Sequence, residues 1–308
     1  MMYTDHFGLT ELPFGLTPDT SFLFSSAQSR YALNTLLVAV KSSEGFIKIT
    51  GEVGTGKTLL CRKFMTMLDD SFVTAYIPNP FLEPRTLLLA LADELGIVLE
   101  KDMDQHHLLK ALNFGLLLLA GEGKRVLLCM DEAQAAPIET LEVLRLLTNL
   151  ETEKRKLLQI VLFGQPELNR ILELKSFRQF TQRITFHYHM ASLSRAEVDD
   201  YVSHRMRVAG FMGSRLFSRA AIGRLYSTSG GIPRLVNIMA HKALMLSYGE
   251  GKQQVTWRHV HVAAKDTLAS KRISTVVSNN INKYLNWSSM TVPAMMCAVA
   301  GLTWVLTK

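Results

Sequence analysis

Residues 51–58 form a glycine-rich stretch that is typical of phosphate-binding loops. They match the pattern G-x-x-x-x-G-K-[ST] and read Gly51-Glu52-Val53-Gly54-Thr55-Gly56-Lys57-Thr58. The glycines let backbone N–H groups wrap around phosphate oxygens, and the helix expected to begin there adds its dipole. Lys57 is expected to reach the β- and γ-phosphates of a nucleotide, and the Thr58 hydroxyl to ligate Mg²⁺. The stretch therefore predicts a site for ATP and Mg²⁺.

Asp131 and Glu132 follow the apolar run at 126–130 and form a Walker B pattern. A carboxylate at the carboxyl end of a buried strand faces the crevice in which open α/β sheets bind ligands. We expect Asp131 to hold Mg²⁺ and Glu132 to act as the base that polarises the attacking water. Gln134 could relay between this base and another site, or lie in the first turn of a helix.

Three further side chains are candidates for contact with the triphosphate. Gln165 follows an expected strand at 158–163 and could sense the γ-phosphate, or be a turn residue before Pro166. Arg183 precedes the next strand and is a candidate arginine finger, supplied to a neighbouring subunit of a ring, with Arg178 as the runner-up. Arg234 opens a later helix and would lean over the phosphates. Each arginine could instead form a surface salt bridge.

Other catalytic chemistries have little support. His187 and His189 share one strand face, but no third ligand lies at a useful spacing, so no zinc site is expected. The three cysteines are far apart and odd in number, which favours a reducing, cytosolic interior over a disulfide framework. The first residues carry no secretory signal.

The elements that must position these residues alternate along the first 190 of the 308 residues. Apolar runs predict strands at 45–50, 72–77, 126–130, 158–163 and 184–189. Helical spacing predicts helices at 29–40, 58–68, 84–95, 105–119 and 138–149. This alternation indicates a parallel α/β sheet covered on both faces, in a nucleotide-binding domain at 1–190.

After residue 190 only helices are expected. A capping box at Ser194 and Glu197 opens a helix to about residue 208, and further helices fit 219–228, 233–248 and 257–271. We assign a helical lid domain to 191–270 and a polar linker to 271–288.

The chain is uncharged from Tyr284 to Thr307, and its apolar centre runs from Met290 to Leu306. A helix over this 17-residue centre would be about 25 Å long, slightly short of a bilayer core of about 30 Å. Trp287 and Trp304 flank the centre as interfacial aromatics would. We predict a membrane-anchor helix at 289–307, the alternative being an amphipathic or buried helix.

Charge is distributed unevenly. Residues 1–150 hold 12 Lys and Arg against 18 Asp and Glu, whereas residues 151–308 hold 22 against 9. The second half, at +13, is therefore expected to meet an anionic partner such as nucleotide phosphates, nucleic acid or a lipid surface, unless it is simply a solvated basic face.

Together these motifs resemble the ExeA/GspA-like branch of the AAA+ ATPases. The resemblance covers residues 3 to about 270 and also rests on Phe7-Gly8-Leu9, Phe163-Gly164-Gln165-Pro166-Glu167-Leu168, Gln182-Arg183-Ile184 and Gly231-Ile232-Pro233-Arg234. It implies a sheet order of 5-1-4-3-2 with a helical lid. It also implies that Gln165 is sensor 1, Arg183 the arginine finger and Arg234 sensor 2.

The resemblance implies an ATPase that forms an ATP-dependent homo-oligomeric ring. Its expected role is assembly of a type IV pilus of the mannose-sensitive haemagglutinin (MSHA) type, or of a related type II secretion machine, at the inner membrane. Peptidoglycan binding is not expected, because the sequence stops at Lys308 directly after the apolar segment. Two alternatives stay open: a DNA-acting AAA+ ATPase of the transposition or initiator type, and a nucleotide-locked scaffold without turnover.

Overall fold

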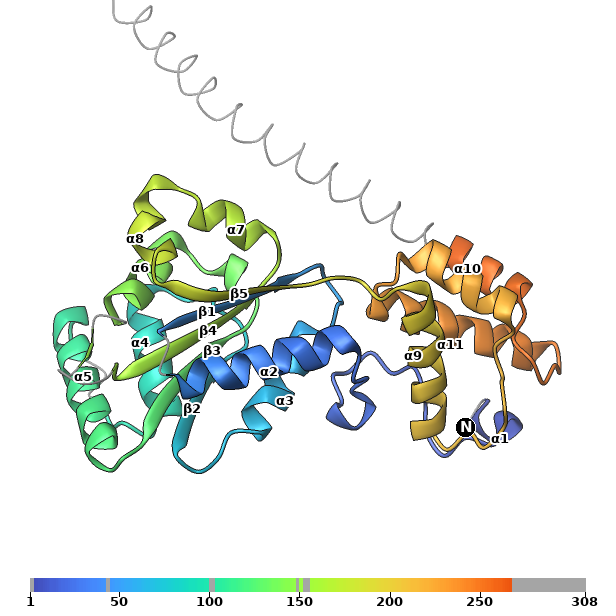
Figure 1. Cartoon of the computed structure of the whole chain (residues 1–308), viewed down its shortest axis with the longest axis horizontal. Helices are drawn as coiled ribbons and strands as arrows, with labels where there is room; N and C mark the ends of the chain where they lie inside the picture. Colours follow the sequence, from blue (N-terminus) through green and yellow to red (C-terminus); the bar gives the residue numbers. More distant parts are fainter. Residues whose placement is uncertain (1–2, 43–44, 100–102, 148–149, 152–155, 268–308) are drawn as a thin grey trace, which may run out of the picture.

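The computed structural model describes residues 3–42, 45–99, 103–147, 150–151 and 156–267. They form an α/β unit followed by a helical unit (Figure 1). The predicted linker at 271–288 and anchor helix at 289–307 lie outside the described residues. Within the ranges just given, no helix is both long and apolar enough to cross a membrane.

Five parallel strands form the sheet: β1 (Phe46–Gly51), β2 (Phe72–Ile77), β3 (Arg125–Met130), β4 (Leu158–Gly164) and β5 (Ile184–Met190). Their order is β2-β3-β4-β1-β5. This is the predicted order read from the other edge, so the prediction of fold class is confirmed. Burial alternates along the edge strand β5, whereas β1 and β4 are buried throughout because they lie inside the sheet and helices cover both of their faces.

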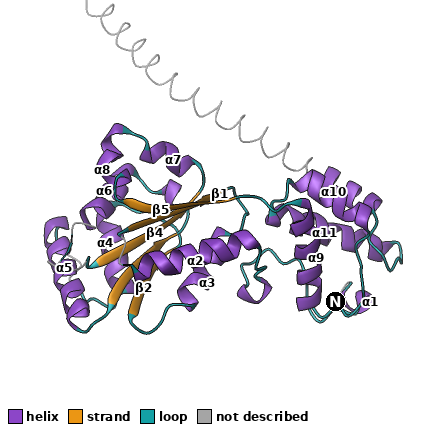
Figure 2. Ribbon diagram, in the orientation of Figure 1, coloured by secondary structure: helices purple, strands orange, loops and turns teal. Residues whose placement is uncertain are grey.

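Helices cover both faces of the sheet (Figure 2). On one face lie α2 (Ala27–Lys41) and α3 (Lys57–Thr66), and on the other α4 (Pro84–Glu94), α5 (Gln105–Gly121), α6 (Ile138–Leu147), α7 (Glu167–Leu172) and α8 (Arg178–Thr181). Short 3-10 turns occur at η1 (Thr20–Phe22), η2 (Ala133–Ala135) and η3 (Lys175–Phe177). Because successive strand side chains point to opposite faces, Leu127 and Cys129 pack toward α2 and α3, and Leu128 and Met130 toward the other layer.

The helical unit contains α9 (Arg195–Val208), α10 (Arg219–Ser229), α11 (Pro233–Gly249) and a helical stretch over 257–267. The predicted capping box is present: the Ser194 hydroxyl accepts from the Glu197 N–H, and the Glu197 carboxylate accepts from the Ser194 N–H. Gly230 ends α10 in the left-handed conformation, which glycine adopts without steric cost.

The N-terminal segment packs against the helical unit rather than the sheet. It begins with α1 (Thr4–Phe7), and its large apolar side chains share one core with α9, α10 and α11: Tyr3, Phe7, Leu9, Phe14 and Phe22. The Tyr3 hydroxyl also contacts His241 Nδ1 at 2.7 Å. Residues 3–22 therefore belong by packing to the helical unit, although chain order grouped them with the domain at 1–190. The domain limits themselves stay a prediction.

Candidate functional site

The glycine-rich loop connects β1 to α3, as the motif predicts. Gly54 and Gly56 have φ angles of 84° and 100°, a backbone region that glycine adopts readily. The Lys57 ammonium group donates to the carbonyl oxygens of Gly51 at 2.8 Å and Glu52 at 3.0 Å. Burial lowers the pKa of Lys57, while nearby carboxylates oppose the shift, first among them Glu132. The loop thus holds the buried Lys57 ammonium group against its own backbone carbonyls.

Asp131 follows the last residue of β3 and is almost fully buried. Its Oδ2 accepts from the Thr58 hydroxyl at 2.5 Å, which joins the two motifs across the sheet edge. Burial raises the pKa of Asp131, although the Thr58 hydrogen bond opposes this. A carboxylate and a hydroxyl oxygen at one point are hard donors of the kind that Mg²⁺ prefers, so these two residues fit a magnesium site.

Glu132 is held by two glutamines. Its φ of 48° is left-handed, and its Oε2 accepts from the side-chain amides of Gln134 at 2.6 Å and Gln165 at 2.9 Å. Gln134 Oε1 in turn accepts from the Gln165 backbone N–H at 2.8 Å. Burial would raise the pKa of Glu132, but these hydrogen bonds and the charge of Lys57 outweigh it and lower the pKa. The carboxylate is therefore ionised and fixed beside the loop.

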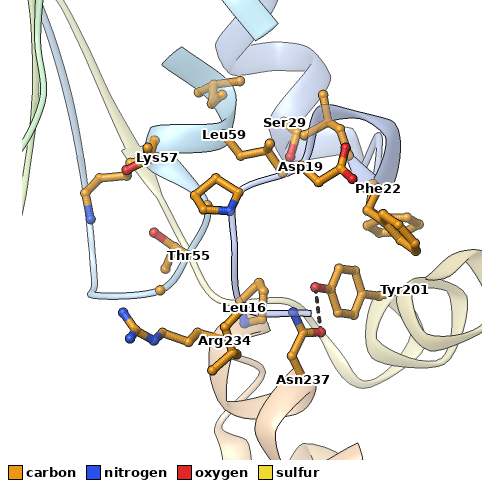
Figure 3. Close-up of a pocket in the computed structure, with 18 of the residues that line it drawn as sticks. Leu16, Asp19, Phe22, Ser29, Thr55, Lys57, Leu59, Tyr201, Arg234 and Asn237 are labelled. Carbon is orange, nitrogen blue, oxygen red and sulfur yellow. Dashed lines mark hydrogen bonds between the residues drawn. The ribbon is translucent and has the colours of Figure 1, made fainter. Parts of the chain in front are cut away.

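Arg234 brings the helical unit onto the phosphate-binding loop. Its backbone N–H donates to the Gly54 carbonyl at 3.2 Å. A Cβ on Gly54 would lie 2.6 Å from the Arg234 Cβ, so this approach requires a glycine as well as its positive φ. Figure 3 shows the Arg234 side chain beside Thr55. The structure thus brings Arg234 together with residues 51–58.

Arg183 does not join this cluster. It precedes β5, which runs parallel to β1 and pairs Met190 with Gly51. Seven residues of strand, at about 3.3 Å each, therefore separate Arg183 from the level of the loop by about 23 Å. Arg178, at the start of α8, lies before β5 as well. Neither arginine can reach the loop of its own subunit, so a contact with the nucleotide bound there is not possible for either.

A cavity of about 220 Å³ lies between the loop, the N-terminal segment and the helical unit. Figure 3 shows Lys57, Thr55 and Arg234 on one side and Phe22 and Tyr201 on the other. The cavity therefore has a polar, cationic side and a side with apolar rings.

Sequence reasoning missed Arg205, which fixes the apolar wall. This α9 residue is 6% exposed, donates to the carbonyls of Pro13 and Gly15, and also contacts the Tyr201 hydroxyl at 3.2 Å. Its guanidinium lies 4.6 Å from the centre of the Phe22 ring. No sequence motif marks it, because the two carbonyls to which it donates are 192 and 190 positions away along the chain.

We expect Arg205→Ala to lower both stability and nucleotide affinity. The change leaves two carbonyls without a charged donor, at a cost of about 2–3 kcal/mol in the free energy of unfolding. The change also removes the contacts that hold residues 13–22 in place as one wall of the cavity. Thermal unfolding and ATP titration measure the two effects. Arg207→Ala, an exposed neighbour on α9, is the control, and equal affinity in both variants would contradict the assigned role.

Comparison with known proteins agrees with this geometry. Residues 40–172 match the family model described as "AAA domain". The chain is 39% identical over 306 residues to general secretion pathway protein A of Aeromonas hydrophila, a match that covers 99% of the chain. It covers 53% of the relative, so the chain spans about half the length of that protein.

Solved structures show the same fold at low identity. The ORC2 protein of Aeropyrum pernix matches with a TM-score of 0.57 and 17% identity, covering 81% of this chain and 72% of that one. Cdc6p of Pyrobaculum aerophilum matches with a TM-score of 0.64 and 16% identity, covering 80% and 70%. A Walker-type ATPase of Pyrococcus abyssi matches with a TM-score of 0.57 and 15% identity, covering 85% and 79%.

Proposed function

We propose that this chain, a member of the ExeA/GspA-like branch of the AAA+ ATPases, binds and hydrolyses ATP with Mg²⁺. The observation that carries the proposal is the convergence of three separate strand ends. Thr58 meets Asp131 at 2.5 Å, and Glu132 meets Gln165 at 2.9 Å, both beside Lys57. These are the groups that phosphoryl transfer to water requires.

Each residue has a role in the proposed reaction. Backbone N–H groups of residues 51–58 and the Lys57 ammonium bind the β- and γ-phosphates. Thr58 and Asp131 hold Mg²⁺, which neutralises charge on the phosphate oxygens when bound. The Glu132 carboxylate orients the attacking water and accepts its proton, while Gln134 and Gln165 keep that carboxylate in place. Arg234 leans over the phosphates from the helical unit, as sensor 2.

The position of Arg183 supports the proposed oligomer. Because this arginine is about 23 Å from its own loop, it can complete a site only on a neighbouring copy. We therefore propose an ATP-dependent homo-oligomeric ring with one site at each interface.

The proposed cellular role is assembly of a secretion machine or type IV pilus, of the MSHA type, at the inner membrane. It is supported by similarity to a general secretion pathway protein. The alternative, action on DNA, is favoured by the +13 charge of residues 151–308.

Purified chain with ATP should release phosphate, and EDTA should stop the release. Phosphate release is measured with and without duplex DNA in the reaction. Unchanged turnover supports the secretion role, whereas stimulation of tenfold or more by DNA would favour the alternative. A chain that binds no ATP at millimolar concentration contradicts the whole proposal.

Removing residues 284–308 should release the protein from membranes. The segment 284–307 is uncharged, and the basic residues before it favour a cytoplasmic ATPase attached by a C-terminal helix. Cell fractionation should find the full chain in the carbonate-resistant inner-membrane pellet and the shortened chain in the supernatant, with nucleotide binding unchanged. Extraction of the full chain by carbonate would show that the segment does not span the bilayer.

A further inference from the structure

The last described helical stretch, residues 257–267, presents an unusual outward face. Trp257 and Val262 are 49% and 51% exposed, although large apolar side chains are normally buried. Arg258 and Lys265 are exposed on the same stretch, and Arg258 lies 5.9 Å from the centre of the Trp257 ring. The spacing of 257, 258, 261, 262 and 265 puts these side chains on one side of a helix. The face therefore mixes an indole, an aliphatic group and cations.

Helix α10 extends this face. The Arg224 guanidinium contacts His261 Nδ1 at 2.8 Å, and the His261 ring lies 6.0 Å from that of Trp257. The acidic residue nearby, Asp266, is already paired with Lys242 of α11. We call this set the basic face; it comprises Arg224, Trp257, Arg258, His261, Val262 and Lys265.

The opposite side of the same stretch is anchored in the protein. Val260, Ala263 and Ala264 are at most 1% exposed and belong to the core shared with α9, α10 and α11. The basic face is thus held rigidly outward by a packed core. Figure 1 shows α10 at the end of the molecule remote from α5.

We propose that the basic face docks the helical unit onto a bilayer surface of anionic phospholipid. Indole rings lie at the level of the headgroups, and cations beside them bind phosphate, which is the composition of an interfacial helix. A positive patch near an anionic leaflet gains binding free energy with each well-placed cation.

The following sequence favours a membrane over other anionic partners. Only 16 residues, 268–283, separate the described helix from the uncharged segment 284–307, and they contain three basic and no acidic residues. Fully extended, they reach at most about 55 Å. If 284–307 is in the bilayer, the face is confined near the headgroups, and this high effective concentration strengthens a weak contact. The inference rests on the proposed membrane attachment.

Trp257 reports docking directly once the other two tryptophans are replaced. The test uses the full chain with Trp287→Phe and Trp304→Phe, reconstituted into vesicles of phosphatidylcholine alone or mixed with phosphatidylglycerol. We expect Trp257 emission to shift to the blue, and iodide quenching to fall, only in the anionic vesicles. High salt should reverse both changes, because charge drives the contact.

Matched triple variants identify the residues. Arg224→Gln, Arg258→Gln and Lys265→Gln together should weaken docking by about 100-fold, since each cation near the surface contributes roughly a factor of five. Lys110→Gln, Arg170→Gln and Lys175→Gln remove the same charge from exposed positions of the α/β unit and should leave docking unchanged. Equal loss in both triples would mean that net charge, not this face, is responsible.

Three other outcomes would contradict either the docking face or the membrane attachment on which it rests, and they can be told apart. Identical Trp257 emission in both vesicle types contradicts the docking face, even if the chain stays in the vesicles. Failure of the chain to remain with either vesicle contradicts the membrane attachment instead. Quenching of Trp257 in detergent by duplex DNA, stronger than any change caused by anionic lipid, would assign the face to nucleic acid.

Discussion

Glu132→Gln should bind ATP but hydrolyse it about 10²–10⁴ times more slowly than the unchanged chain. The amide has nearly the same size as the carboxylate, but it cannot accept a proton from the attacking water. Lys57 and the loop are untouched, so affinity for ATP should be preserved. Because bound ATP then persists, the variant should also favour the oligomer. Phosphate release, ATP titration and size-exclusion chromatography with ATP measure the three properties.

Glu122→Gln is the matched control for Glu132→Gln. This residue is exposed and lies at the C-terminal cap of α5. Its replacement by glutamine removes the same single negative charge. Its turnover should equal that of the unchanged chain. If Glu132→Gln hydrolyses ATP at the normal rate, another group is the base.

Arg183→Ala should lower the turnover rate by a factor of about 10³–10⁵ and leave the affinity for ATP unchanged. An arginine supplied by a neighbour stabilises charge on the transferring phosphoryl group, and alanine cannot replace it. Because Arg183 lies at the opposite end of β5 from its own loop, we expect the loss to occur at the site of the adjacent copy. Single-turnover hydrolysis and ATP titration separate the effect on chemistry from the effect on binding.

Mixing two inactive variants tests the role of Arg183 in the neighbouring subunit. Lys57→Ala lacks a working loop but keeps Arg183, so a mixed interface pairs an intact loop with an intact finger. Partial activity in the mixture is the expected result. If no mixing ratio restores turnover, while Arg178→Ala shows the rescue instead, Arg178 is the finger.

Local signals in the sequence predicted the five strands and the longer helices, but not the short helices α1, α7 and α8. Strands at 72–77 and helices beginning at 84, 105, 138, 195, 219 and 233 start where the patterns place them. These predictions succeed because periodicity, capping boxes and glycine-rich turns act within one or two turns of chain. The sheet order followed from the resemblance, and not from any of these local patterns.

The end-of-strand rule also predicted which motifs would meet. Thr58, Asp131, Glu132 and Gln165 follow or flank different strands, and parallel strands bring their carboxyl ends to one edge. The hydrogen bonds between Thr58 and Asp131, and between Glu132 and Gln165, agree with that geometry. Their roles in hydrolysis are still predictions.

The sequence by itself therefore determined a nucleotide-binding sheet and a list of candidate residues, because each of these depends on short-range pattern. Only the tertiary structure decided that residues 3–22 pack with the helical unit and that Arg205 holds the cavity wall. Both depend on which surfaces, distant along the chain, pack together. The carbonyl of Pro13 and the guanidinium of Arg205 are separated by 192 positions, and no local signal connects them.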